Sequence, residues 1–119
     1  MDTKEVGTKL VELCQLGKNL EAIDTLYSDD IVSVEARGDE TMPAEMRGIA
    51  AIRGKSQWWL ENHEVHAGSA EGPMVNGDRF TVIFEFDITP KQTGERVKMK
   101  EVALYSVDGG KIVREEFYY

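Results

Sequence analysis

Apolar residues recur at helical spacing in the first half of the chain and at alternate positions in the second half. The helical spacing predicts three helices, over residues 3–16, 19–27 and 48–62. The alternation predicts four strands, over residues 65–75, 79–89, 96–107 and 111–119. An earlier strand is expected at 31–36, and the polar residues 37–47 are typical of a loop.

This order of elements predicts an α+β fold. Helices that precede a strand meander pack as one layer on one face of a curved antiparallel sheet. The 119 residues correspond to one domain, 1–119, of a size that buries its own hydrophobic core.

The alternation also predicts the register between the strands 79–89 and 96–107. Folding them about the loop between them places Asp87 opposite Lys98 and Glu85 opposite Lys100. Opposite charges directly across a strand pair favour that register. We therefore expect these four side chains on the outer face of the sheet.

The other face of the same two strands is predominantly apolar. It places Phe80 opposite Tyr105 and Phe84 opposite Glu101. Because helices cover the apolar face of a sheet, we assign this face to the helices. Glu101 is then an inward-facing carboxyl group.

The outer face keeps an apolar patch beside its charges, formed by Ile83, Val102 and Leu104. Exposed apolar patches of this kind are typical of subunit interfaces. The sequence therefore predicts a homodimer that forms through the outer sheet face.

The chain is acidic, with 22 Asp and Glu against 14 Lys and Arg and a net charge of −8. This balance argues against binding to nucleic acid or to an anionic membrane, both of which require a basic surface. The sequence has no long apolar run and no signal-peptide pattern at its N-terminus, so we expect a soluble, cytoplasmic protein. The single cysteine, Cys14, lies among leucines and is interpreted as a small buried apolar residue.

Four segments occur in an order that resembles a known family: SDDIVSVE at 28–35, GIAAIR at 48–53, FTVIFEF at 80–86 and DGGKIVREEFY at 108–118. Together they resemble the SnoaL-like branch of the nuclear transport factor 2-like superfamily, which includes polyketide cyclases and ketosteroid isomerase. The resemblance implies a cystatin-like, cone-shaped half-barrel with a pocket inside the cone. Because relatives have different activities, the fold alone does not assign a reaction.

Comparison with ketosteroid isomerase implies that Glu35 occupies the position of the general base. The two positions that would donate hydrogen bonds to the substrate oxygen fall on Leu10 and Ala103. Neither side chain can donate a hydrogen bond. We therefore do not predict steroid isomerase activity.

The facing of the last strand depends on the turn at Gly109 and Gly110. A plain two-residue turn would direct inward the side chains of Ile112, Arg114, Glu116 and Tyr118. A bulge at these glycines would instead direct inward Val113, Glu115, Phe117 and Tyr119. We favour the bulge, because burying one glutamate on a pocket costs less than burying Arg114 together with Glu116.

The candidate catalytic residues are the three inward glutamates, Glu35, Glu101 and Glu115. An apolar cone raises the pKa of a carboxyl group and suits it to proton transfer near neutral pH. Tyr105 and Tyr119 are candidate hydrogen-bond donors to a substrate oxygen. The remaining candidate substrate contacts are aromatic: Trp58, Trp59, Phe84 and Phe117.

These residues suggest a pocket for a mostly apolar small molecule, with cofactor-free acid/base chemistry of the isomerase, cyclase or dehydratase type. The alternative is a non-catalytic module that binds a ligand or only dimerises. We expect no cofactor. His63 and His66 are spaced as a possible metal pair, but no third ligand accompanies them, so no metal is expected.

Overall fold

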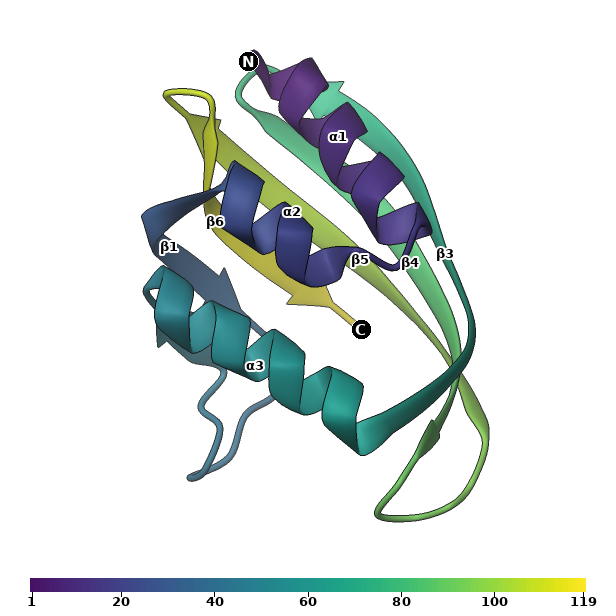
Figure 1. The fold of residues 1–119 in the computed structure, drawn as a ribbon. Coiled ribbons are helices and arrows are strands. Elements are labelled where there is room, and N and C mark those ends of the chain that lie inside the picture. Colours follow the sequence, from purple (N-terminus) through teal and green to yellow (C-terminus); the bar gives the residue numbers. More distant parts are fainter.

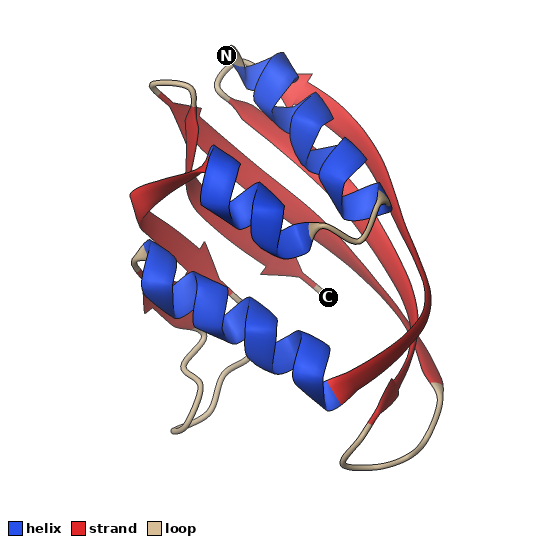
Figure 2. Ribbon diagram, in the orientation of Figure 1, coloured by secondary structure: helices blue, strands red, loops and turns tan.

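The computed structural model describes residues 1–119 and places three helices on one face of a curved six-stranded sheet (Figure 1). The helices are α1 (Thr3–Gln15), α2 (Asn19–Leu26) and α3 (Ile49–Asn62). The strands are β1 (Tyr27–Val34), β2 (Glu45–Arg47), β3 (His63–Asn76), β4 (Arg79–Pro90), β5 (Val97–Asp108) and β6 (Lys111–Tyr118). Figure 2 shows the separation into a helical layer and a sheet layer. The predicted α+β class is confirmed.

The sheet is mixed rather than wholly antiparallel, which corrects the prediction. Its strand order is β2-β1-β6-β5-β4-β3, and β1 runs parallel to β6. The first and last long strands therefore lie side by side, although most of the chain separates them. Alternation reveals which residues face the core, but it carries no information on the direction of a non-consecutive strand pair.

Two boundaries near β1 also differ from the prediction. The strand begins at Tyr27, directly after α2, and not at residue 31. The segment 37–47, expected to be a loop, contains the short strand β2, which pairs with Val32 and Val34 of β1. Three residues are too few for a period of two to be recognised in sequence.

Helix α1 begins with a capping box and packs closely on the sheet. The Asp2 carboxylate accepts a hydrogen bond from the Glu5 amide at 2.8 Å, and the Glu5 side chain accepts one from the Asp2 amide. Val6 and Leu10 are buried against the inner face of the sheet. Gly7 lies between them and leaves no room for a Cβ atom, which would lie 2.8 Å from Pro73.

The predicted register of β4 and β5 is confirmed, with Asp87 opposite Lys98 and Glu85 opposite Lys100. Only one of the two opposite charge pairs in this register forms an ion pair. Lys100 lies 3.9 Å from Glu85, whereas the Asp87 carboxylate accepts hydrogen bonds from Nε and Nη2 of Arg96, each at 2.8 Å. The inner assignment is confirmed as well, because Phe80 and Tyr105 are buried and their rings stack at 4.8 Å.

The last strand combines a plain turn with a later bulge. Asp108 faces Lys111 across a two-residue turn, so the bulge is not at Gly109 and Gly110 as predicted. The register instead shifts after Ile112, which is buried opposite Val107. From there Glu115 faces inward and is 3% exposed. Gly109 and Gly110 both have the positive φ angles that this turn requires and that glycine readily adopts. The shift in register directs the charged Arg114 side chain away from the core.

Candidate functional site

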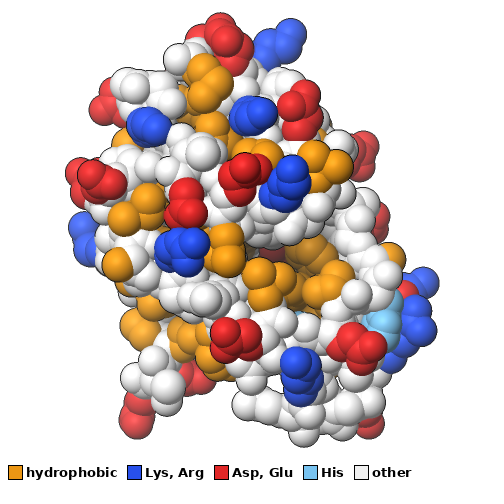
Figure 3. Space-filling view, viewed as in Figure 1, with side chains coloured by type: hydrophobic (Ala, Val, Ile, Leu, Met, Phe, Trp, Pro, Cys, Tyr) orange, Lys and Arg blue, Asp and Glu red, His pale blue; other side chains and the backbone are white.

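A cavity of about 150 Å³ lies between the helices and the inner face of the sheet. Figure 3 shows this face of the molecule hollowed between α2 and α3, where hydrophobic side chains gather. Of the 19 lining residues 13 are hydrophobic, so an apolar ligand surface would be well accommodated.

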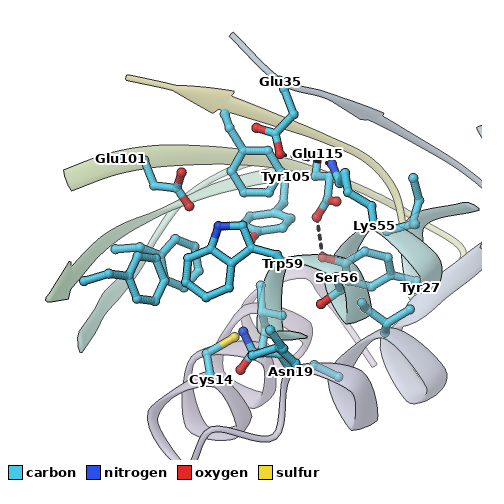
Figure 4. Close-up of a pocket in the computed structure, with 18 of the residues that line it drawn as sticks. Cys14, Asn19, Tyr27, Glu35, Lys55, Ser56, Trp59, Glu101, Tyr105 and Glu115 are labelled. Carbon is cyan, nitrogen blue, oxygen red and sulfur yellow. Dashed lines mark hydrogen bonds and ion pairs between the residues drawn. The ribbon is translucent and has the colours of Figure 1, made fainter. Parts of the chain in front are cut away.

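All three predicted glutamates line this cavity. Glu35 directly follows β1, Glu101 comes from β5 and Glu115 from β6. Figure 4 shows the Glu115 carboxyl group bound to Tyr27, with Glu35 and Glu101 at separate positions on the cavity wall. Four of the predicted contact residues line it too: Trp59, Phe84, Tyr105 and Phe117. The other two, Trp58 and Tyr119, do not.

Trp58 and Tyr119 are both exposed, at 41% and 48%. Trp58 lies on the solvent side of α3, one residue before the inward Trp59. Tyr119 follows the end of β6, and its ring lies 5.9 Å from the Arg37 guanidinium. Both were predicted to contact the substrate, but neither side chain lines the cavity.

Glu115 is the most enclosed of the three glutamates. Its carboxylate accepts hydrogen bonds from the Tyr27 hydroxyl and from Ser33 Oγ, the latter at 2.7 Å. Burial raises the pKa of Glu115 above its usual range, while Lys55 and the two hydrogen bonds oppose the increase. Both carboxylate oxygens are thus bound by protein groups.

Lys55 on α3 is the cation of the site, and sequence reasoning missed it. Its ammonium group donates to Ser33 Oγ at 2.7 Å and to Glu35 Oε1 at 3.1 Å. It also lies 5.3 Å from the centre of the Phe117 ring. The available signal was its spacing, because Lys55 follows the buried Ile52 by three residues and therefore shares its helix face.

Glu101 differs from the other two glutamates because no protein group binds its carboxyl group. It is half-buried and takes part in none of the hydrogen bonds or ion pairs of the site. Burial, and then the charges of Glu35 and Glu115, raise the pKa of Glu101 to about 7, with Lys55 opposing. This group can hold or release a proton near neutral pH.

The other titratable groups on the cavity wall are held in their protonated forms. Burial and the nearby Glu115 raise the pKa values of Tyr27 and Tyr105 well above the usual range. Burial also raises the pKa of the Cys14 thiol to about 12, which removes it as a nucleophile. The tyrosines are therefore hydrogen-bond donors and not bases.

Aromatic rings border the cavity near the end of α3. Trp59 stacks on His63 with 4.5 Å between ring centres and lies 5.4 Å from Phe86. His63 Nδ1 donates to the Trp59 carbonyl oxygen at 2.7 Å, whereas His66 Nε2 lies 2.7 Å from Thr89 Oγ1. The two histidines thus have separate partners. Leu10 lines the cavity and Ala103 is fully buried. Because both side chains are apolar, neither donates a hydrogen bond to a ligand.

Comparison with known proteins identifies relatives of the whole chain. The model of the SnoaL-like domain family matches residues 1–119. A protein from Mesorhizobium loti, assigned as a SnoaL-like polyketide cyclase and as a carbohydrate phosphatase, is 52% identical, with 100% of both chains covered and a TM-score of 0.95. No curated protein matches the chain.

More distant structures share the fold. A Xanthomonas campestris protein of unknown function with a cystatin-like fold is 20% identical, covers 99% of this chain and 90% of its own, and has a TM-score of 0.79. A Bacillus subtilis protein assigned as an isomerase is 18% identical, with 99% and 88% covered and a TM-score of 0.78. They confirm the cystatin-like architecture. None of the helices has the length and hydropathy that a membrane span requires.

Proposed function

Because the chain belongs to the SnoaL-like family, we propose that its cavity binds a small, mostly apolar molecule and catalyses cofactor-free proton transfer on it. The observation that supports this most is the carboxyl group of Glu101. It faces an apolar cavity without a protein partner, and its pKa of about 7 balances proton uptake and release.

The three glutamates have separate roles in this proposal. Glu101 transfers the proton, since it alone is free to meet a ligand. Glu35 is paired with Lys55, and Glu115 anchors Tyr27 and Ser33. Tyr105, whose hydroxyl stays protonated, is the donor to a ligand oxygen.

The reaction class is proton transfer at a carbon next to a carbonyl group, the step that isomerisation, cyclisation and dehydration have in common. The cavity volume of about 150 Å³ matches that of an apolar cavity known to hold benzene. A ligand of one or two small rings, partly projecting from the opening, is therefore the appropriate probe.

A ketone exchange assay tests the proposal. We expect the protein to accelerate deuterium exchange at the α-carbons of cyclohexanone and 1-tetralone in D₂O, measured by NMR. Glu101→Gln removes the proton-transfer group and should slow the catalysed exchange by about 10²-fold or more. Glu85→Gln, the same change on the outer face of β4, is the matched control and should leave the rate unchanged.

The alternative function, a non-catalytic ligand-binding module, predicts a different result. The ketones would then shift the NMR signals of cavity residues and yet exchange no faster than in buffer. Equal exchange by the wild type and Glu101→Gln would also overturn the assignment of Glu101.

The proposal includes a homodimer that forms through the outer sheet face, and a cytoplasmic location. Ile83, Val102 and Tyr118 lie opposite one another across β4, β5 and β6, and Leu104 lies in the next row on the same face. A single free cysteine is typical of a reducing compartment.

A further inference from the structure

The charged groups that face the cavity are three carboxyl groups and one ammonium group. The carboxyl groups belong to Glu35, Glu101 and Glu115, and the ammonium group to Lys55. Lys55 is already bound to Glu35 and Ser33, so it has little capacity left for an anionic ligand. The charge available to a ligand is therefore negative, and it is concentrated on Glu101.

The walls around Glu101 are aromatic. Phe84 lies opposite it on β4, and the rings of Trp59, Phe86 and Phe117 complete the wall. Aromatic faces attract ammonium groups, and the attraction increases when water is excluded. The protein already contains such an arrangement, because the Lys55 ammonium lies between the Glu35 carboxylate and the face of Phe117.

We propose that the natural ligand of this cavity is a small protonated amine that carries an apolar group, with its ammonium group bound by Glu101 and the aromatic wall. This inference rests on the proposed function in one respect, that the cavity is a ligand site; toward an ammonium group Glu101 acts as the binding group and not as the proton-transfer group. The apolar group fills the space lined by Leu10, Ile23 and Ile52. Anionic molecules, phosphate esters among them, meet three carboxyl groups and no free cation.

The proposal predicts that binding depends on pH in a definite direction. An amine cation binds the ionised form of Glu101, whose pKa is about 7. Glu35, Glu115 and Lys55 are the charged groups that face it, while Cys14, Tyr27 and Tyr105 keep their protons. Lowering the pH protonates Glu101 and therefore weakens binding of the amine, whereas the affinity for a neutral ligand does not change.

Three ligands of nearly identical shape test this inference: benzylamine, benzyl alcohol and benzoate. Calorimetric titration at about pH 8 should give an affinity for benzylammonium at least about tenfold above that for benzyl alcohol, with benzoate weakest. Between about pH 8 and about pH 6 the benzylammonium affinity should fall about tenfold, as expected when a proton competes at a group of pKa about 7.

Glu101→Gln should abolish both the preference for the amine and its pH dependence, while Glu85→Gln should retain both. Circular dichroism confirms that the variants are folded. Equal affinity for benzylamine and benzyl alcohol, or tightest binding of benzoate, overturns the inference. The proposed function fails separately, since amine binding without ketone exchange removes only the catalytic proposal.

Discussion

At the scale of single residues, the surroundings of the three cavity glutamates separate one group from the other two. Glu115 has hydrogen bonds to both oxygens, and Glu35 has an ion pair with Lys55 at 3.1 Å. The Glu101 carboxyl group is partly buried and has no bonding partner, which disfavours its charged form. The ionised carboxyl group in this position therefore costs stability, and a bound cation would offset that cost.

The cost of Glu101 gives a prediction for the pH dependence of stability. The pKa of Glu101 is raised from 4.5 to about 7 on folding. Below pH 4.5 Glu101 is protonated in both the folded and the unfolded state, so it does not lower the free energy of unfolding. As the pH rises toward 7, the unfolded state releases the proton first, so the free energy of unfolding falls and then levels off above that pKa.

Glu101→Gln cannot ionise and should escape this loss. Relative to the wild type, we expect it to gain up to about 3 kcal/mol of stability between about pH 4 and about pH 8. Urea unfolding of both proteins at the two pH values measures the difference. Glu115 is present in both proteins, so the difference reports Glu101 together with its electrostatic coupling to Glu115. A difference that stays constant with pH contradicts the buried, unpaired state of Glu101.

At the scale of elements, the contact between α1 and the β3–β4 hairpin depends on the absence of one side chain. A Cβ atom at Gly7 would lie 2.8 Å from Pro73 Cβ and 3.2 Å from the Phe80 ring. Gly7→Ala should lower the free energy of unfolding, because a contact of 2.8 Å with Pro73 places the overpacking cost in the upper part of about 1–3 kcal/mol, above the gain of about 1 kcal/mol in helix propensity.

Gly54→Ala is the matched control for that change. Gly54 lies in α3 and is exposed, with no atom within 4 Å of the position of its Cβ. There the same substitution should stabilise the protein by about 0.4–1 kcal/mol. Urea unfolding midpoints of the two variants should therefore shift in opposite directions. A stabilising Gly7→Ala would show that α1 packs less closely than described.

The elements also show which parts of the fold could be predicted from the sequence. Alternation and charge pairing predicted the β4–β5 register and placed Glu101 inward, because both signals are local to a hairpin. The parallel pairing of β1 with β6 has no local signal, and the position of the bulge in β6 depends on burying Ile112. Lys55 was missed for a similar reason: a lysine on a helix is usually solvated, and only the fold brings Glu35 to it.

At the scale of the whole molecule, the helices cover one face of the sheet and leave the other open (Figure 1). On the open face Ile83, Val102 and Tyr118 form one row across three strands, and Leu104 lies in the next row opposite Glu116. Tyr118 is 52% exposed. Pairing two such faces would bury the row in both copies and leave the cavities open on the opposite sides.

Leu104→Arg tests this arrangement. An arginine at this position would lose its hydration in the dimer, and the Glu116 carboxylate opposite it is already bound by Arg114 and Tyr118. We therefore expect the variant to sediment as a monomer where the wild type sediments as a dimer. Val97→Arg adds the same charge to the same strand at an exposed position beyond the patch, and should remain dimeric. A monomeric wild type, or a dimer that tolerates Leu104→Arg, would contradict the interface. Retention of ketone exchange or benzylammonium binding by the monomeric variant would show in addition that each cavity is complete within one chain.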